Sequence, residues 1–152
     1  MDTDSGTTVE RRTLILRGAA WVLVACYMGG IWYLSSQGEE VTSRVDAAGV
    51  SDFWAHLVLY GGLSGLLFVA FWTTWPQQAW GWLIVGAAAW AFGYGLIDEL
   101  HQSFNPARGT DPQDLQGNLM GAVSAQVLGG FVVAVWRLLH TGGRPSEAAE
   151  DE

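Results

Sequence analysis

Four long apolar runs constrain this chain more than any other feature of its sequence. They cover Leu14–Leu34, Phe53–Trp75, Trp80–Ile97 and Leu119–Leu139. Each run is close to the ~20 residues that an α-helix needs to cross a hydrocarbon core about 30 Å thick. A bilayer core accepts only helices or closed barrels, because every backbone N–H and C=O must find a partner within the protein. The runs therefore predict an all-α integral membrane bundle of four transmembrane helices.

Short sequence signals between and within the runs predict how the helices are joined and packed. Pro76 follows the second run, and proline cannot continue a helix, so a short turn should make the second and third helices antiparallel. Small residues recur in Gly61-x-x-x-Gly65 and Gly117-x-x-x-Gly121. Glycines at this spacing allow helix backbones to approach closely in lipid. We therefore expect a compact bundle.

The charged residues divide the chain into a membrane domain and two tails. Residues 1–13 read as a cytoplasmic acidic tail, residues 14–140 as the four-helix transmembrane domain, and residues 141–152 as a disordered acidic tail. The chain has seven cationic side chains, all arginine, against fifteen acids. Seven cations against fifteen acids cannot neutralise a run of phosphates. This balance excludes nucleic acid as a partner. Membrane lipids are the expected partners, and the sequence leaves the oligomeric state open.

The arginines also predict the orientation in the membrane. With four spans both termini lie on the same side, which carries Arg11, Arg12, Arg17, Arg137 and Arg144. The opposite side carries only Arg44 and Arg108. Cytoplasmic loops carry the excess of arginine and lysine, so both termini should be cytoplasmic in a multi-pass protein of the plasma membrane. The loops after the first and third helices then face outward.

The single cysteine, Cys26, lies within the first apolar run. The residues after it stay apolar instead of forming a polar tether, and Arg17 interrupts the run before it. These features favour an uncleaved first helix over a lipoprotein signal, with Cys26 buried in the bundle. A single cysteine also excludes an internal disulfide.

Polar side chains gather where the second helix begins and the third ends. Asp52, His56 and Tyr60 follow at every fourth position, so they form one stripe that descends ~6 Å per step. Near the end of the third run, Asp98 and Gln102 share a face in the same way. Glu99 lies about 100° around the helix from Asp98, so the two acids need not face the same partner.

The fourth helix adds polar residues at the same depth. It should begin at Asp111-Pro112, an N-cap followed by a proline in the first turn, which places Asp114 at its mouth and Asn118 one turn deeper. Charged groups within a span cost about 2.5–3.5 kcal/mol each on insertion scales, so they usually face the bundle interior. We therefore predict one polar pocket, open to the outer face. Its binding residues are Asp52, His56, Tyr60, Asp98, Glu99, Gln102, Arg108, Asp114 and Asn118.

Each of these residues also has a structural interpretation. Asp52 could be a helix cap, and Asp114 would be favoured near a helix start by the helix dipole alone. His56 could be a hydrogen-bonded core residue, and Asn118 could join helices to one another. Arg108 could close a loop by pairing with Glu99 or Asp114. The shared depth of the set, more than any single member, favours a pocket.

Three segments carry a family resemblance. They are "WYLSSQ" at Trp32–Gln37, "SDFWAHLVLYGGL" at Ser51–Leu63 and "DELHQSFNPARGTDPQDLQGNLMGA" at Asp98–Ala122. With them the chain resembles the VanZ-like family of small polytopic membrane proteins. The resemblance implies a helical membrane bundle and an association with resistance to the glycopeptide teicoplanin. One position departs, because Phe53 stands where the family commonly has a lysine. If that lysine holds an anionic ligand in relatives, this chain lacks it, or an arginine substitutes.

Three functional hypotheses follow from the pocket. The first is a non-enzymatic envelope protein that binds a lipid headgroup, a lipid-linked envelope precursor or a glycopeptide, with Arg108 on an anionic group. The second is an intramembrane hydrolase or transferase in which Glu99 or Asp98 acts as general base with His56, although no serine stands in a nucleophile motif. No cofactor is expected. No spacing matches a known metal motif, so no metal site is predicted. A metal site stays open as the third hypothesis. Its oxygen and imidazole ligands would come from Asp52, His56, Asp98, Glu99, His101 and Asp114.

Overall fold

The structure, a computed structural model, describes residues 3–37, 51–104 and 112–141. Within these ranges it consists of α-helices, with a short turn between the second and the third of them, and contains no strand. The helices are α1 (Thr3–Ser36), α3 (Asp52–Thr74), α4 (Trp80–Ser103) and α5 (Pro112–Thr141). All four are long and apolar enough to cross a membrane. The predicted all-α bundle of four membrane-spanning helices is confirmed.

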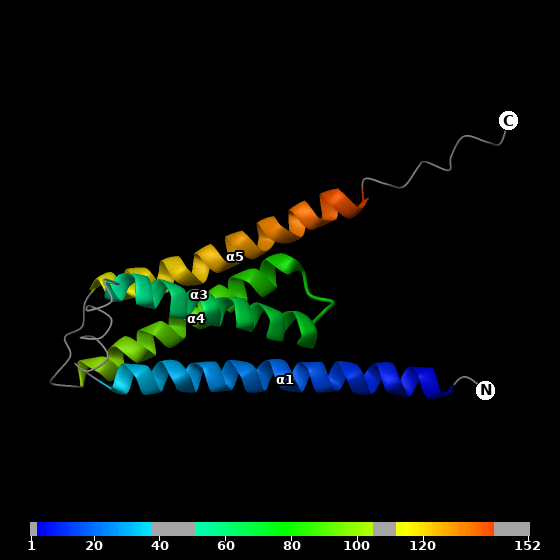
Figure 1. Cartoon of the computed structure of the whole chain (residues 1–152), viewed down its shortest axis with the longest axis horizontal. Helices are drawn as coiled ribbons and strands as arrows, with labels where there is room; N and C mark the ends of the chain where they lie inside the picture. Colours follow the sequence, from blue (N-terminus) through cyan, green and yellow to red (C-terminus); the bar gives the residue numbers. More distant parts are fainter. Residues whose placement is uncertain (1–2, 38–50, 105–111, 142–152) are drawn as a thin grey trace.

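The helices alternate in direction along the length of the bundle. Figure 1 shows α1 running from right to left, α3 returning, α4 running back to the left and α5 leaving toward the right, where its far end diverges from α4. The last residue of α1 and of α4 and the first residue of α3 and of α5 therefore share one end. This end is called the polar end below.

The helices extend beyond the apolar runs that predict them. α4 continues past Ile97 to Ser103, and α5 begins at Pro112, a full turn and more before Leu119. Proline at the first helical position fits because its missing N–H would have no partner there in any case. The polar residues at the end of α4 and at the start of α5 therefore lie within regular helix. Their side chains therefore point in directions set by the helical repeat.

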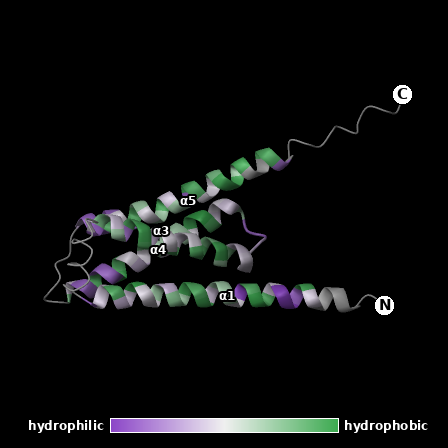
Figure 2. Cartoon of the chain, in the orientation of Figure 1, coloured by the Kyte–Doolittle hydropathy of each residue, from purple (hydrophilic) through white to green (hydrophobic). Residues whose placement is uncertain are grey.

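The hydrophobic core forms around α3. This helix packs against α1, α4 and α5. Its core side chains are Leu63, Leu67, Ala70 and Phe71, which meet Val24 and Ile31 of α1, Leu83, Ala87 and Ala91 of α4, and Ala122 of α5. Most other large apolar residues point outward. Figure 2 shows apolar stretches along the middle of all the helices and hydrophilic ones at the polar end and near the start of α1.

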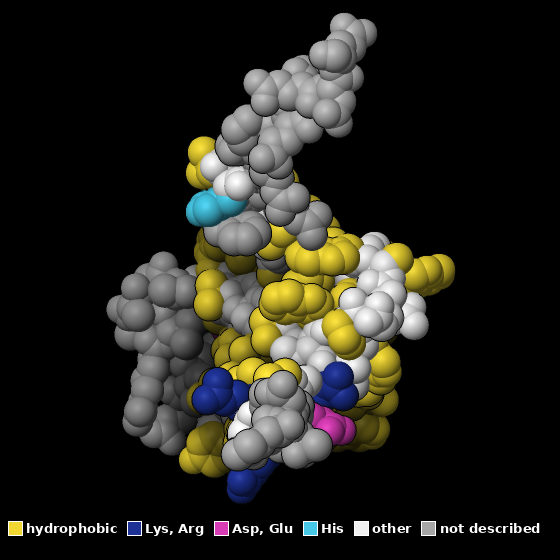
Figure 3. All heavy atoms as spheres, turned by 90° about the vertical axis from the view of Figure 1, so that its right-hand side faces the viewer, with side chains coloured by type: hydrophobic (Ala, Val, Ile, Leu, Met, Phe, Trp, Pro, Cys, Tyr) yellow, Lys and Arg dark blue, Asp and Glu magenta, His cyan; other side chains and the backbone are white. Residues whose placement is uncertain are grey.

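The outward apolar surface is what a bilayer requires of a bundle this small. Seen from the side where the termini lie, the molecule is covered mainly by hydrophobic side chains (Figure 3). The arginine and acidic side chains on this face gather at the bottom, over the beginning of α1. Arg11 and Arg12 are exposed there. Chains of this kind keep charge at the ends of the spans and apolar atoms between them.

Glycine brings α3 and α5 into backbone contact. A Cβ atom at Gly121 would overlap the carbonyl oxygen of Leu57, and one at Gly117 would lie 2.8 Å from the carbonyl oxygen of Phe53. A Cβ at Gly61 would lie 3.2 Å from the carbonyl oxygen of Gly121, whereas one at Gly65 would meet nothing within 4 Å. The Gly117–Gly121 pair therefore forms the close approach that the sequence predicts, whereas Gly65 does not contribute.

Polar contacts also fix the other end and the middle of the bundle. Arg17 donates from Nε to the carbonyl oxygen of Thr73 at 2.7 Å, and Trp21 donates from Nε1 to the Thr74 hydroxyl at 2.9 Å. In the middle, buried Gln126 donates from Nε2 to the hydroxyl and carbonyl oxygens of Ser64 at 2.8 and 2.9 Å. These bonds tie α1 and α5 to α3 at separate depths.

The expectation that Cys26 is buried is wrong. Its side chain is exposed on α1. The face of α1 that packs on the bundle follows Val24 and Ile31, a seven-residue step that the helical repeat keeps on one side. Cys26 lies about 200° around the helix from Val24 and so points away from the bundle.

Candidate functional site

The polar end contains two groups of buried polar side chains. The first, called the Asp98 network, comprises Ser35, Tyr60, Asp98 and Gln102. The second, called the His56 cluster, comprises His56, Glu99, Asp114 and Asn118. Together they draw on all four helices. Nothing in the apolar runs requires polar groups at these positions, so their convergence needs a separate explanation.

Asp98 is the hub of the first group and is fully buried. Its Oδ2 atom accepts hydrogen bonds from the Ser35 hydroxyl at 2.7 Å, the Tyr60 hydroxyl at 3.0 Å and Gln102 Nε2 at 3.1 Å. These donors come from α1, α3 and α4. Buried polar groups are tolerated when their hydrogen bonds are made, so the network can join three helices within the span.

His56 is the hub of the second group. Its Nδ1 atom lies 2.8 Å from Asn118 Oδ1 of α5 and 3.9 Å from Glu99 Oε1 of α4. Its Nε2 atom lies 3.9 Å from Asp114 Oδ2. One ligand atom from each of His56, Glu99 and Asp114 lies within 4.8 Å of the other two. Two acids and an imidazole from three helices thus face a common point.

The contact with Asn118 fixes the tautomer of His56. An amide oxygen can only accept, so Nδ1 must carry the hydrogen and donate it to Asn118 Oδ1. A neutral imidazole then has its lone pair on Nε2, the atom that faces Asp114. The lone pair and the carboxylate oxygen are both electron-rich. Their approach is favourable when Nε2 carries a proton or when a cation lies beside them.

Two glycines make room for this arrangement. A Cβ atom at Gly117 would lie 3.0 Å from His56 Cβ, and one at Gly95 would lie 2.8 Å from Asn118 Nδ2. Gly117 thus lets α5 approach α3, and Gly95 lets the Asn118 side chain lie against α4. Larger residues at either position would separate His56 from its partners.

Tyr60 connects the two groups. Its hydroxyl belongs to the Asp98 network, while its ring stacks on His56 with centroids 6.0 Å apart and planes 8° from parallel. The spacing of four residues on α3 produces this stacking directly. A movement of His56 would therefore shift the Tyr60 side chain and with it the hydrogen bond to Asp98.

A serine and a histidine also meet at the rim of the polar end, outside both groups. His101 Nε2 lies 3.2 Å from the Ser36 hydroxyl, and its ring stacks on Trp32 with centroids 3.9 Å apart. Ser36 donates its hydrogen to the carbonyl oxygen of Trp32 at 2.7 Å. The hydroxyl therefore accepts from His101, so the histidine is not placed as a base that would activate this serine.

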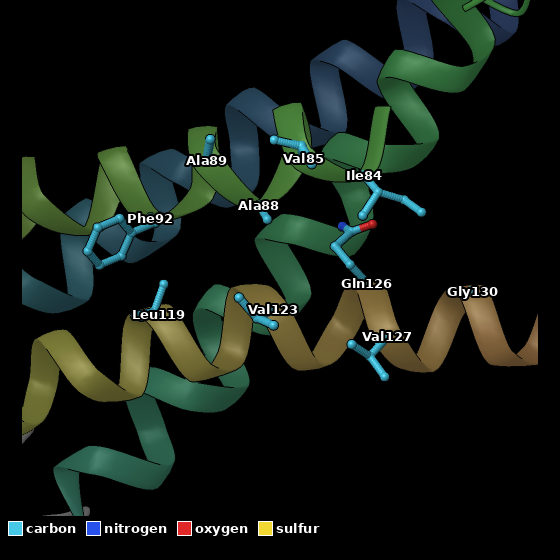
Figure 4. Close-up of a pocket in the computed structure, with 10 residues that line it drawn as sticks. All are labelled: Ile84, Val85, Ala88, Ala89, Phe92, Leu119, Val123, Gln126, Val127 and Gly130. Carbon is cyan, nitrogen blue, oxygen red and sulfur yellow. The ribbon is translucent and has the colours of Figure 1, made fainter. Parts of the chain in front are cut away.

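An apolar groove runs between α4 and α5 (Figure 4). Its volume is about 570 Å³. Side chains from both helices point into it, among them Phe92 and Ala88 of α4 and Leu119 and Val123 of α5. Leu119 directly follows Asn118 in the chain. The first groove residue of α5 is therefore the next residue after a member of the His56 cluster.

The comparison with known families identifies the chain. A family model described as VanZ/LLP1 matches residues 20–133. The chain belongs to the VanZ/LLP1 family. No curated protein and no solved structure matches it. The matched region of this VanZ-like protein includes both polar groups and the groove, so these features lie within the family's domain. The resemblance drawn from the three sequence segments is confirmed.

Most of the predicted site residues of this VanZ-like protein lie together. His56, Tyr60, Asp98, Glu99, Gln102, Asp114 and Asn118 all belong to the two polar groups. Asp98 and Glu99 face different partners, as the 100° offset indicates. Tyr94, which repeats the spacing of Asp98 and Gln102, donates to the carbonyl oxygen of Met28 at 2.8 Å.

Two predicted residues stand apart from the groups. Asp52 is partly exposed in the first turn of α3 and belongs to neither group. The N-cap is Ser51, which makes no side-chain capping bond. Arg108 lies outside the described residues, so its predicted pairing with Glu99 or Asp114 stays a prediction. Phe53, at the family's usual lysine position, places its ring against Trp54 with centroids 5.4 Å apart.

Sequence reasoning missed one member of the Asp98 network and the mid-bundle pair. Ser35 lies in the segment Trp32–Gln37, but only the packing of α1 against the bundle brings it to Asp98. Ser64 and Gln126 lie far apart in the chain and meet across the α3–α5 contact. A glutamine within an apolar span is the one signal that would have suggested a buried partner.

Proposed function

We propose that this VanZ-like membrane protein binds an amphiphile of the cell envelope, with a polar headgroup at the His56 cluster and an apolar chain in the α4–α5 groove. The observation that carries the proposal is that α4 and α5 contribute to both features. Glu99, Asp114 and Asn118 on these helices belong to the His56 cluster. The groove between the same helices begins on α5 at Leu119, the residue after Asn118. A lipid or a lipid-linked envelope precursor has this combination of a polar head and an apolar tail.

The chemistry of the polar end supports a headgroup rich in hydrogen-bond donors. The His56 cluster contains the carboxyl groups of Glu99 and Asp114, whose oxygens accept hydrogen bonds. A hydroxyl- or amine-bearing headgroup can donate to them, and hydrogen bonds to a carboxylate are among the stronger ones. Ionisable residues within a span are expensive and usually functional.

The groove supports an apolar chain as the second part of the ligand. Its lining consists of Val, Leu, Ile, Ala, Phe and Gly residues, with Gln126 as the one polar member, already bonded to Ser64. Ligand pockets typically combine such apolar walls with a small number of placed polar groups. Each methylene moved from water into apolar surroundings contributes about 0.8 kcal/mol, but a lipid chain already in the bilayer gains much less. Selectivity would therefore reside in the headgroup.

The location follows from the arginines. Both termini would be cytoplasmic in the plasma membrane, and the polar end would face outward. At this surface a lipid, an envelope precursor and a glycopeptide such as teicoplanin would all have access. The founding member of the family is associated with teicoplanin resistance, which supports an envelope role of this kind.

The contacts of the serines favour binding over catalysis. Ser35 donates to Asp98 at 2.7 Å, and Ser36 donates to a backbone carbonyl. Neither hydroxyl is directed at His56, the histidine that Glu99 and Asp114 surround. An acid–base enzyme built on Glu99, Asp98 and His56 would need to recruit its nucleophile from the substrate or from water.

The test is a mass-spectrometric search for lipids that copurify with the protein. We expect a defined lipid class to remain with the wild type through detergent exchange and to be lost from Glu99→Gln. Glu10→Gln makes the same chemical change on an exposed residue at the other end of α1 and should retain the lipid.

A second pair of variants tests the groove. Ala88→Phe would fill the groove and should lower lipid retention, whereas Leu96→Phe, on the exposed side of α4, should not. Lipid profiles that are the same for the wild type, Glu99→Gln and Ala88→Phe would contradict the proposal.

A further inference from the structure

We propose that His56, Glu99 and Asp114 form a binding site for a divalent transition-metal ion. These residues come from α3, α4 and α5, so the site would join three helices at the polar end. The proposal does not depend on the amphiphile, because it concerns the metal alone. It also departs from the expectation drawn from the sequence, in which no metal spacing can be recognised.

The separations of the ligand atoms fit one ion. Zinc binds imidazole nitrogen at about 2.0–2.1 Å and carboxylate oxygen at about 2.0–2.2 Å, so two ligands of one ion lie at most about 4.3 Å apart. His56 Nε2 and Asp114 Oδ2 are 3.9 Å apart, within this limit. The three-residue set as a whole lies within 4.8 Å. A rotation that moves a carboxylate by about 0.5 Å would bring all three to coordinating distance.

The gap between the two atoms is longer than a direct hydrogen bond. An N–H···O hydrogen bond needs about 2.7–3.2 Å between its heavy atoms, whereas Nε2 and Asp114 Oδ2 are 3.9 Å apart. The gap leaves room for an ion that both atoms can bind.

Asn118 provides an independent indication. It is fully buried, and its Nδ2 atom has no hydrogen-bond partner within the part of the chain that the structure describes. Burying an amide without all its hydrogen bonds is costly. In return, Asn118 Oδ1 accepts a hydrogen bond from His56 Nδ1 at 2.8 Å. A histidine that ligates a metal almost always donates its other N–H to an acceptor of this kind, which fixes the ring and exposes the second nitrogen.

The ligand types indicate the class of metal. Imidazole suits zinc, copper, iron and nickel, whereas sites built only of oxygen suit magnesium and calcium. One histidine with two carboxylates should therefore prefer Zn²⁺ and Mn²⁺ to Mg²⁺ and Ca²⁺. Three protein ligands also leave a coordination position open, where water or an oxygen of a ligand would bind.

The experiment is a metal titration of the tag-free, full-length protein in detergent after chelator treatment. Zn²⁺ is titrated by calorimetry, and Mn²⁺ by electron paramagnetic resonance. We expect one ion per chain. Asp114→Asn should weaken Zn²⁺ binding at least tenfold, and Asn118→Ala, which only orients His56, should weaken it about 10–100-fold. If Asp114→Asn does not fold, Glu99→Gln replaces it.

The controls are a histidine and an acid away from the cluster. His140→Gln and Glu10→Gln change exposed residues at the opposite end of the bundle and should leave the affinity within twofold of the wild type. Absence of Zn²⁺ and Mn²⁺ binding by the wild type would overturn the proposal. An affinity that falls equally in His140→Gln or Glu10→Gln and in Asp114→Asn would also overturn it. Neither result bears on lipid retention, which is read separately by mass.

Discussion

Replacing Gly121 by alanine tests whether the α3–α5 contact holds the polar end together. The added methyl group would overlap the carbonyl oxygen of Leu57 and lie 3.0 Å from the backbone nitrogen of Gly61. Both neighbours are backbone atoms and cannot rotate away. The two helices would therefore have to separate by roughly 1 Å to restore ordinary contact distances of about 3.5–4.0 Å.

The magnitude follows from two opposing effects. Overpacking of this kind costs typically about 1–3 kcal/mol. Alanine also favours the helix over glycine by about 1 kcal/mol, which offsets part of the cost. Gly129→Ala isolates the effect of helix propensity, because a Cβ at Gly129 meets nothing within 4 Å. Both variants gain the same propensity on α5, so their difference should equal the overpacking cost of about 1–3 kcal/mol.

The assay is equilibrium unfolding in mixed micelles, followed by tryptophan fluorescence. Gly129→Ala should unfold at the same or a higher denaturant fraction than the wild type, and Gly121→Ala at a lower one. Gly121→Ala should also lose lipid retention and metal binding, because the separation would withdraw Asn118 and Asp114 from His56. Equal unfolding of the two alanine variants would refute the packing argument.

Three further predictions concern single contacts and the orientation. Tyr60→Phe removes one hydrogen-bond donor from Asp98 and should lower the free energy of unfolding by about 1–2 kcal/mol. Tyr94→Phe removes a hydrogen bond to a backbone carbonyl and should lower it by about half as much in the same assay. Cys26→Ala should change the unfolding free energy by less than about 0.5 kcal/mol because the side chain is exposed, and a larger loss would place it in a contact. In a Cys26→Ala background, Gln37→Cys should react with an impermeant maleimide in intact cells and Gln77→Cys should not, and the reverse pattern would overturn the orientation.

The sequence predicts the fold and much of the polar end for a definite physical reason. Spans must be long and apolar to cross a bilayer, so four runs are enough to predict four helices. Polar residues at four-residue spacing must share a helix face, which correctly grouped Asp98 with Gln102. Because charge is excluded from lipid, the polar faces were expected to point inward, and they do.

The pairing of residues between helices could not be predicted in the same way. Helix period fixes the direction of a side chain on its own helix, but rotation and depth relative to a neighbour depend on packing. The sequence allowed His56 to be a hydrogen-bonded core residue without naming its partner, which is Asn118 because Gly117 brings α5 so close. The proposed metal site could not be predicted from the sequence for the same reason, since its three residues come from three separate helices.

A headgroup titration tests the central claim most directly. The wild-type protein is titrated with lipids that share identical acyl chains but differ in headgroup, and each dissociation constant is read by native mass spectrometry. We predict at least a tenfold preference for one headgroup class, about 1.4 kcal/mol, which is the scale of one hydrogen bond to a charged group. In Glu99→Gln this preference should disappear while the affinity common to all the lipids remains. Equal dissociation constants for every headgroup in the wild type, or an unchanged preference in Glu99→Gln, would contradict a headgroup site at the His56 cluster.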